Sequence, residues 1–166
     1  MNEETAVSGS ATPVDAACFE EYLDRATDEV FSTMMGVACA PDRKPAARDG
    51  ETISAVIGLA GALSGSLILH TSGPAAMRIA ERMIGLAPAE VDGMVRDAIG
   101  EVCNMIAGAW KGFNASLASG CLLSTPTVVA GTSYELFSER APIRLERSYR
   151  FEEMTFVITI ACELYA

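Results

Sequence analysis

One stretch of the chain, residues 97–108, places polar side chains at the spacing of a helix face. Asp97, Glu101, Asn104 and Gly108 follow one another at intervals of four, three and four residues, so on an α-helix they share one face. A carboxylate and a carboxamide then stand one turn apart. Such a pair can orient a water molecule or bind a lysine of a partner protein, and it is also common on the solvated face of an ordinary helix.

The apolar residues around this stretch indicate how the polar face is held toward solvent. They recur at spacings of three and four on the opposite side of the helix, as expected for a side that packs on a core. They are Val95, Ile99, Val102, Ile106, Ala109 and Phe113. We predict a long helix that begins near Pro88, with Glu90 in its first turn, and extends to Trp110 or beyond.

Two further helices and a hairpin are predicted before this helix. The residues from Asp15 to about Met35 carry an apolar stripe at helical spacing. Residues 52–59 and 63–70 alternate between apolar and smaller or polar side chains, which predicts a two-stranded hairpin with one buried face. Ser72 then starts a helix, with Pro74 in its first turn, that ends at Gly85.

The last third of the chain is strand-like. Residues 143–151 and 154–164 alternate between two faces, and Arg147 interrupts the apolar side of the first of these strands. Pro126 indicates an edge or a break within residues 121–130. Helices and hairpins that are segregated in this way predict an α+β fold, a single domain with helices packed on a mostly antiparallel sheet.

The composition is that of one acidic globular domain. Half of the 166 residues are hydrophobic and a fifth are charged, with a net charge of −10. We expect residues 1–13 to form a flexible N-terminal tail and residues 14–166 to form the domain. The negative charge repels phosphate backbones, so we expect no nucleic-acid partner. We see neither a secretory signal nor an apolar run of membrane length, and we expect a cytoplasmic protein without a membrane partner.

Few residues of this chain indicate a catalytic or metal site that the protein could form without a partner. His70, the one histidine, ends a predicted strand, where a surface or hydrogen-bonded role is commoner than catalysis. The five cysteines are scattered without a CxxC pair, and Cys103, beside the polar face, is the one thiol to watch. The sequence contains no phosphate-binding loop and no acidic cluster at metal-ligand spacing, so we expect no metal site.

The polar face and a later proline together resemble the signature of a known family. The run from Asp97 through Glu101 to Asn104, with Pro126 22 positions after Asn104, resembles the motif of the CheC/CheX/FliY chemotaxis phosphatases. The predicted order of elements over residues 15–165 is similar to that family as well. CheC and FliY usually carry two such helices, whereas the N-terminal helix here has no asparagine after its glutamates. The single motif is similar to CheX.

The resemblance implies a protein phosphatase that hydrolyses the aspartyl phosphate of a CheY-like response regulator in chemotaxis or two-component signalling. By the match to the motif, Asn104 would orient the attacking water and Glu101 would contact the regulator's lysine. We expect Asp97, Gly108 and Lys111 to contact the partner as well. No cofactor of the chain's own is implied, because Mg²⁺ and the phosphoaspartate would come from the regulator. A homodimer formed through the sheets is also implied.

Two other interpretations remain open at this point. The chain can be a catalytically silent CheX-like module that binds a receiver domain or another signalling partner. It can also be a structural dimer whose acidic helix face is merely solvated. The presence of both Glu101 and Asn104 favours the enzyme, because a silent module has no need for that pair. The net charge of −10 would slow the encounter with an acidic receiver, so local pairing would have to dominate.

Overall fold

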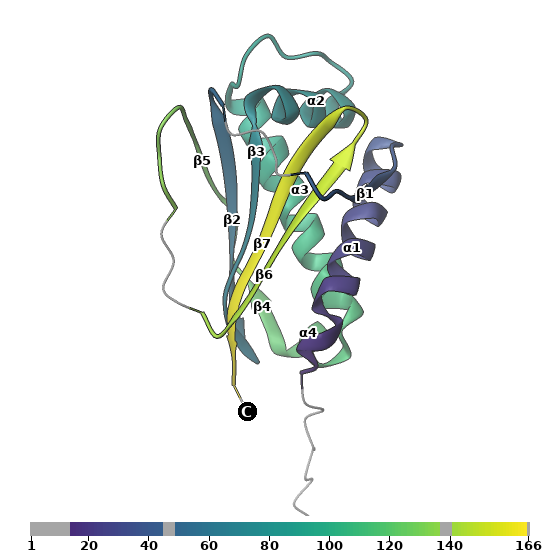
Figure 1. Cartoon of the computed structure of the whole chain (residues 1–166), viewed down its shortest axis with the longest axis vertical. Coiled ribbons are helices and arrows are strands. Elements are labelled where there is room, and N and C mark those ends of the chain that lie inside the picture. Colours follow the sequence, from purple (N-terminus) through teal and green to yellow (C-terminus); the bar gives the residue numbers. More distant parts are fainter. Residues whose placement is uncertain (1–13, 45–48, 137–140, 166) are drawn as a thin grey trace, which may run out of the picture.

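The computed structural model describes residues 14–44, 49–136 and 141–165, which form a sheet with helices on one face (Figure 1). The predicted α+β fold is therefore confirmed, whereas the predicted flexible tail, residues 1–13, lies outside the described residues. The helical elements are η1 (Ala16–Cys18), α1 (Phe19–Val30), η2 (Phe31–Met35), α2 (Gly73–Ile84), α3 (Gly93–Phe113) and α4 (Ala115–Gly120). The strands are β1 (Cys39–Pro41), β2 (Thr52–Gly61), β3 (Leu63–Ser72), β4 (Cys121–Leu123), β5 (Thr127–Gly131), β6 (Ile143–Phe151) and β7 (Met154–Leu164).

The sheet has seven strands among the described residues, and all of their pairings are antiparallel. The order is β1-β6-β7-β3-β2-β4, and β5 pairs with β2 on the same edge as β4. The predicted hairpin is confirmed, because β2 pairs with β3 from Thr52 opposite Ser72 to Leu59 opposite Gly65. The break predicted at Pro126 is also confirmed, since this residue lies between β4 and β5.

The core lies between the helices and the face of the sheet that they cover. Alternate strand residues point toward the helices and are fully buried, among them Ile57, Leu67 and Ile160. Trp110 of α3 is also fully buried, and its indole nitrogen donates a hydrogen bond to the Phe19 carbonyl at 3.2 Å. Each large apolar side chain buried in this way contributes about 1.5–3 kcal/mol to the free energy of unfolding, so the sheet fixes α1 and α3 in place.

The caps of α2 are those that the sequence predicts. The Ser72 hydroxyl accepts a hydrogen bond from the Ala75 amide at 3.3 Å, which satisfies an amide that the first turn leaves unpaired. Gly85 ends the helix with φ of 82°, a left-handed conformation that glycine adopts without steric cost. The N-terminal helical segment ends in the same way, at Gly36 with φ of 67° after the π-helical turn η2.

The start of α3 differs from the prediction. The helix begins at Gly93, with Asp92 as its cap, rather than near Pro88. The Asp92 carboxylate accepts a hydrogen bond from the Val95 amide at 3.0 Å. This cap fixes the first turn, whereas Pro88 and Glu90 lie in the connection from α2. The helix extends to Phe113, beyond Trp110 as expected.

Candidate functional site

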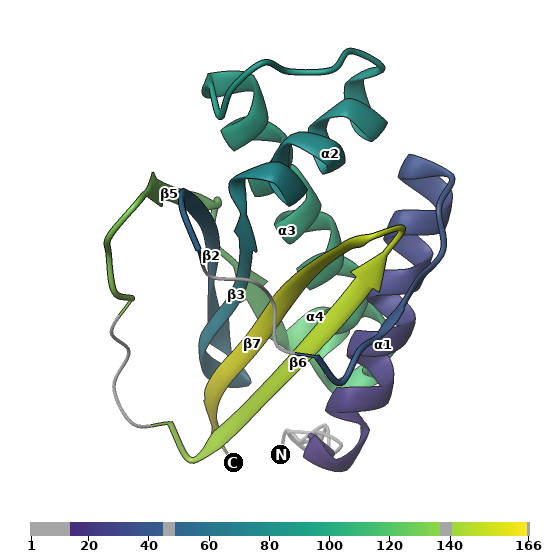
Figure 2. The same cartoon turned by 45° about the horizontal axis from the view of Figure 1, so that its top comes forward.

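The polar face of α3 points away from the core, as its spacing predicts. Asp97 and Glu101 are exposed, whereas Asn104 and Gly108 are half-buried. We call these four residues the α3 polar face. Figure 2 shows α1, α3 and the sheet that supports them. On the opposite side of α3, Ala109 and Phe113 are half-buried. The other four predicted apolar residues have no exposed surface: Val95, Ile99, Val102 and Ile106.

The side chains of the α3 polar face are not used within the described part of the protein. Asp97, Glu101 and Asn104 form no hydrogen bond and no ion pair with other side chains described there. Their carboxylate and carboxamide groups are therefore available to a molecule that approaches from solvent. A carboxylate can bind a lysine, and a carboxamide can both accept and donate a hydrogen bond to water.

Gly108 and Lys111, two further residues expected to contact the partner, differ in their surroundings. A Cβ atom built on Gly108 would have no neighbouring atom within 4 Å, so the position is open, and its contact with a partner's backbone stays a prediction. The Lys111 ammonium instead donates a hydrogen bond to the Cys121 carbonyl at the start of β4. In this conformation the Lys111 ammonium is bound within the protein, and its contact with a partner stays a prediction.

Pro126 lies against the helix beside the α3 polar face. A Cβ atom built on Gly100 would stand 3.4 Å from Pro126 Cγ and 3.2 Å from Val128 Cγ2. Gly100 lies one turn before Asn104, so the motif's proline lies against α3 one turn from the motif's asparagine. The sequence contains both residues, but the pattern alone does not show that Pro126 lies against this helix.

Cys103 lies on the buried side of α3. It has no exposed surface, and its thiol donates a long hydrogen bond of 3.5 Å to the Ala55 carbonyl. Burial raises the pKa of this thiol to about 12, so the reactive thiolate is not formed near neutral pH. The cysteine next to the polar face is therefore a core residue rather than a nucleophile.

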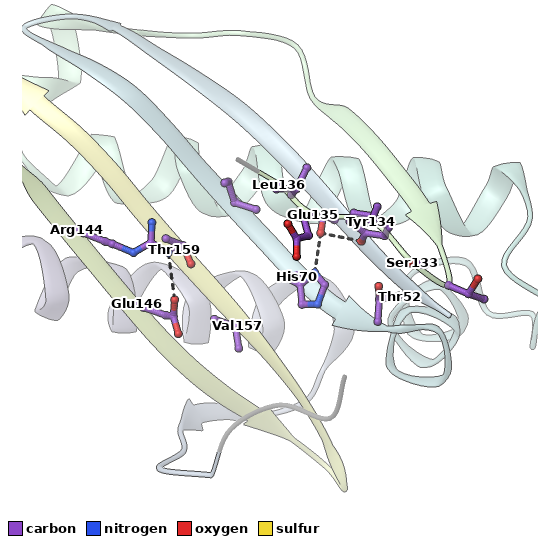
Figure 3. A pocket seen from close by; sticks show the side chains of 13 residues that line it. Thr52, His70, Ser133, Tyr134, Glu135, Leu136, Arg144, Glu146, Val157 and Thr159 are labelled. Carbon is purple, nitrogen blue, oxygen red and sulfur yellow. Dashed lines mark hydrogen bonds and ion pairs between the residues drawn. The ribbon is translucent and has the colours of Figure 1, made fainter. Parts of the chain in front are cut away.

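The single histidine lies on the other face of the sheet. His70 Nδ1 is 2.7 Å from the hydroxyl of Ser54, which is also 2.9 Å from the Tyr134 hydroxyl. These residues line a cavity of about 840 Å³, together with Arg144 and Glu146 (Figure 3). The expected hydrogen-bonded role of His70 is confirmed. The cavity was not predicted, although the polar side chains that alternate along β2, β3 and β6 were its signal.

Within residues 14–44, 49–136 and 141–165, no three histidine, cysteine or acidic side chains come together as a metal-binding group. None of the helices in those same ranges combines the length and apolar character needed to cross a membrane.

Comparison with known proteins places this architecture in a family. Residues 53–145, more than half of the chain, match the family model described as chemotaxis phosphatase CheX. No curated protein matches the chain. The crystal structure of CheX from Vibrio vulnificus is similar over 87% of this chain and 96% of its own, with 26% identity and a TM-score of 0.75.

Two further solved structures have the same fold. CheX from Desulfovibrio desulfuricans has 23% identity and a TM-score of 0.73, with 87% of this chain and 99% of that chain covered. A chain of the CheX–CheY–BeF₃–Mg²⁺ complex from Borrelia burgdorferi has 19% identity and a TM-score of 0.66, with 87% and 97% covered. The family match spans β2 to the start of β6, including α3 and Pro126. This chain therefore belongs to the CheX family of chemotaxis phosphatases.

Proposed function

We propose that this chain is a phosphatase that hydrolyses the aspartyl phosphate of a CheY-like response regulator. The observation that carries the proposal is the pair of Glu101 and Asn104, which lie one turn apart on α3 and have no partner among the described residues. Membership of the CheX family supports it. The relative from Borrelia burgdorferi, whose complex holds CheY, BeF₃ and Mg²⁺, supports a receiver of the CheY type as the partner.

In the proposed mechanism the chain contributes position rather than a nucleophile. The Asn104 carboxamide holds a water molecule in line with the phosphoryl group, and Glu101 binds a lysine of the regulator. The water oxygen bonds to phosphorus as the bond to the aspartyl oxygen breaks, which gives inorganic phosphate and a free carboxylate. The phosphoaspartate and Mg²⁺ belong to the regulator in this proposal, so the chain needs no cofactor of its own.

The remaining residues of the site have simpler roles in this proposal. Asp97 lies one turn before Glu101 and extends the acidic part of the face toward the partner. Gly108 leaves space for the partner's backbone, because a Cβ atom there would meet no atom of the chain within 4 Å. We also propose that the protein acts in the cytoplasm as a homodimer formed through its sheets, which light scattering on the purified protein would test.

The enzyme is tested by the release of phosphate from a phosphorylated CheY-like regulator of the same organism. Wild-type protein should accelerate release above spontaneous decay, and Asn104→Ala should lose about a hundredfold of that acceleration. Thr33→Ala, which truncates an exposed polar residue of η2, is the control and should act like wild type. Thermal melts should coincide for all three proteins, since neither substitution removes a buried contact.

Three outcomes would count against parts of this proposal. A wild-type protein that binds phosphorylated regulators without accelerating release would be the silent module, and one that does not bind would leave only the structural dimer. An Asn104→Ala protein with full activity would remove Asn104 from the reaction even if the activity stands.

A further inference from the structure

A short segment, residues 121–128, runs along one side of the helix that carries the proposed site. It contains β4, the turn with Pro126, and the start of β5. We call it the flanking segment. It contacts α3 at two places, one on each side of Asn104 along the helix.

The first contact is at Gly100, one turn before Asn104. An added Cβ atom at this position would stand 3.2 Å from Val128 Cγ2, with Pro126 Cγ and Cβ at 3.4 and 3.5 Å. The first of these separations is tighter than ordinary van der Waals contact. The helix and the flanking segment therefore approach as closely as a glycine allows.

The second contact is at Lys111, two turns after Asn104. Its ammonium donates a hydrogen bond to the Cys121 carbonyl, and the charge makes this bond stronger than a neutral one. Because Gly100 and Lys111 lie on the same side of α3, the two contacts resist both rotation and sliding of the helix between them.

The flanking segment is in turn held on the sheet. The Ser124 amide donates to the Gly58 carbonyl at 2.9 Å, and the Gly58 amide donates to the Ser124 hydroxyl at 2.8 Å. This reciprocal pair joins the turn to β2, in the middle of that strand. The flanking segment thus links α3 to the sheet and fixes the position of the helix relative to the strands.

We propose that the flanking segment is a positioning device, which sets the place of the Asn104 carboxamide relative to the docked regulator. The inference rests on the proposed phosphatase function. Reactions that depend on the alignment of a water molecule lose rate when the aligning group moves by a fraction of an ångström to an ångström. Gly100, Pro126 and Val128 would then affect catalysis without touching the substrate.

The test is to add one methyl group at the tight contact and then remove the nearest atom that it meets, Val128 Cγ2. Gly100→Ala should lower kcat for phosphate release about tenfold and change KM by less than about twofold. Gly112→Ala is the matched control, because it adds a methyl to the same helix where no atom lies within 4 Å. It should have wild-type kcat. The double variant Gly100→Ala, Val128→Ala, which takes away Val128 Cγ2, should recover kcat to within about threefold of wild type.

Each result supports or overturns the inference. Wild-type kcat in Gly100→Ala overturns it, and so does a double variant that is no better than the single one. A rise in KM with unchanged kcat also overturns it, because it would mean that the methyl disturbs docking. If the wild-type protein does not accelerate phosphate release, the proposed function fails and this inference fails with it. If wild type is active and one of the results above is found, the inference alone fails. Melting curves for all variants show that the comparison is made on folded protein.

Discussion

Two charged regions of this protein use their charges in opposite ways. On the α3 polar face, Asp97 and Glu101 point to solvent without an ion pair in the described structure. Between α1 and β6, Arg147 donates two hydrogen bonds to Asp24, at 3.0 and 2.6 Å, and Tyr149 donates a third to the same carboxylate at 2.7 Å. We call the second group the Arg147 cluster.

The comparison separates charges that hold the fold from charges that are free to bind. In the Arg147 cluster the hydrogen bonds to Asp24 raise the pKa of Arg147, and burial together with Asp24 raises the pKa of Tyr149. These groups are fixed in one charge state by their neighbours. The α3 polar face has no such neighbours in the described chain. A chain with net charge −10 gains no stability from exposed acids, which favours a role for them in binding.

The largest expected effect on stability comes from breaking the Arg147 cluster. Asp24→Ala leaves the guanidinium partly buried without its main partner and a buried tyrosine hydroxyl without an acceptor. We expect the free energy of unfolding to fall by about 2–3 kcal/mol. Urea denaturation measures this change. Glu21→Ala, on an exposed position of the same helix, should change it by less than about 0.5 kcal/mol.

The activity of the Asp24 variant shows whether the two regions act independently. At a temperature where Asp24→Ala is folded, its proposed phosphatase activity should match that of wild type, because the Arg147 cluster lies away from the α3 polar face. A loss of activity in folded Asp24→Ala would show that the two regions are coupled, which would contradict their separation.

The α3 polar face should respond in the reverse way. Glu101→Gln keeps the size of the side chain and removes its charge, so the proposed contact with the regulator's lysine weakens. We expect KM for the phosphorylated regulator to rise about tenfold, and the free energy of unfolding to change by less than about 0.5 kcal/mol. Glu21→Gln is the matched control and should have wild-type KM. If Glu101→Gln unfolded more readily, Glu101 would belong with the structural charges.

The distinction between charges that hold the fold and charges that are free to bind could be predicted only in part from the sequence. The spacing of Asp97, Glu101 and Asn104 is local, and a helix fixes which of its residues share a face whatever surrounds it. The alternation along β2 and β3 is local in the same sense. These are the parts of the fold and of the candidate site that the sequence pattern predicts well.

Long-range contacts could not be predicted in this way. Arg147 interrupts an apolar strand face, but its partner Asp24 is 123 residues away, and no pattern connects the two. Lys111 continues the polar face by spacing, yet its ammonium meets the Cys121 carbonyl because the chain turns back there. The predicted start of α3, near Pro88, was wrong. Pro88 and Glu90 are good first-turn residues, but Asp92 caps the helix through its side chain.

A smaller effect is expected from one atom of the Arg147 cluster. Tyr149→Phe removes the hydroxyl that donates to Asp24 at 2.7 Å and leaves the ring in place. Asp24 keeps its two bonds from Arg147, so we expect the free energy of unfolding to fall by about 1 kcal/mol. Urea denaturation of wild type, Tyr149→Phe, Asp24→Ala and the double variant forms a double-mutant cycle. A double variant that loses the full sum of the two single effects would show that the hydroxyl acts independently of Asp24.

The smallest expected effect is on the pH dependence of the free energy of unfolding. Glu152, in the turn between β6 and β7, accepts a hydrogen bond from Arg78 Nε at 2.7 Å and another from Arg82. Hydrogen bonding from Arg78, which donates twice, and then from Arg82 holds the pKa of Glu152 below its ordinary value of 4.5. A carboxylate whose folded pKa is lowered stabilises the fold above the unfolded pKa, and this stability is lost as the pH falls through the folded pKa.

The free energy of unfolding should therefore fall as the pH is lowered below about 4.5, and this fall should be shallower in Glu152→Gln, which keeps the side chain's length and the turn's backbone. Urea denaturation of both proteins at several pH values between neutral and acidic measures the difference. Thr33→Ala is the control, because it removes no titratable group and should leave the pH dependence as it is in wild type. Equal slopes for Glu152→Gln and wild type would mean that Glu152 does not stabilise the fold through its charge, and the turn between β6 and β7 would then be held by its backbone alone.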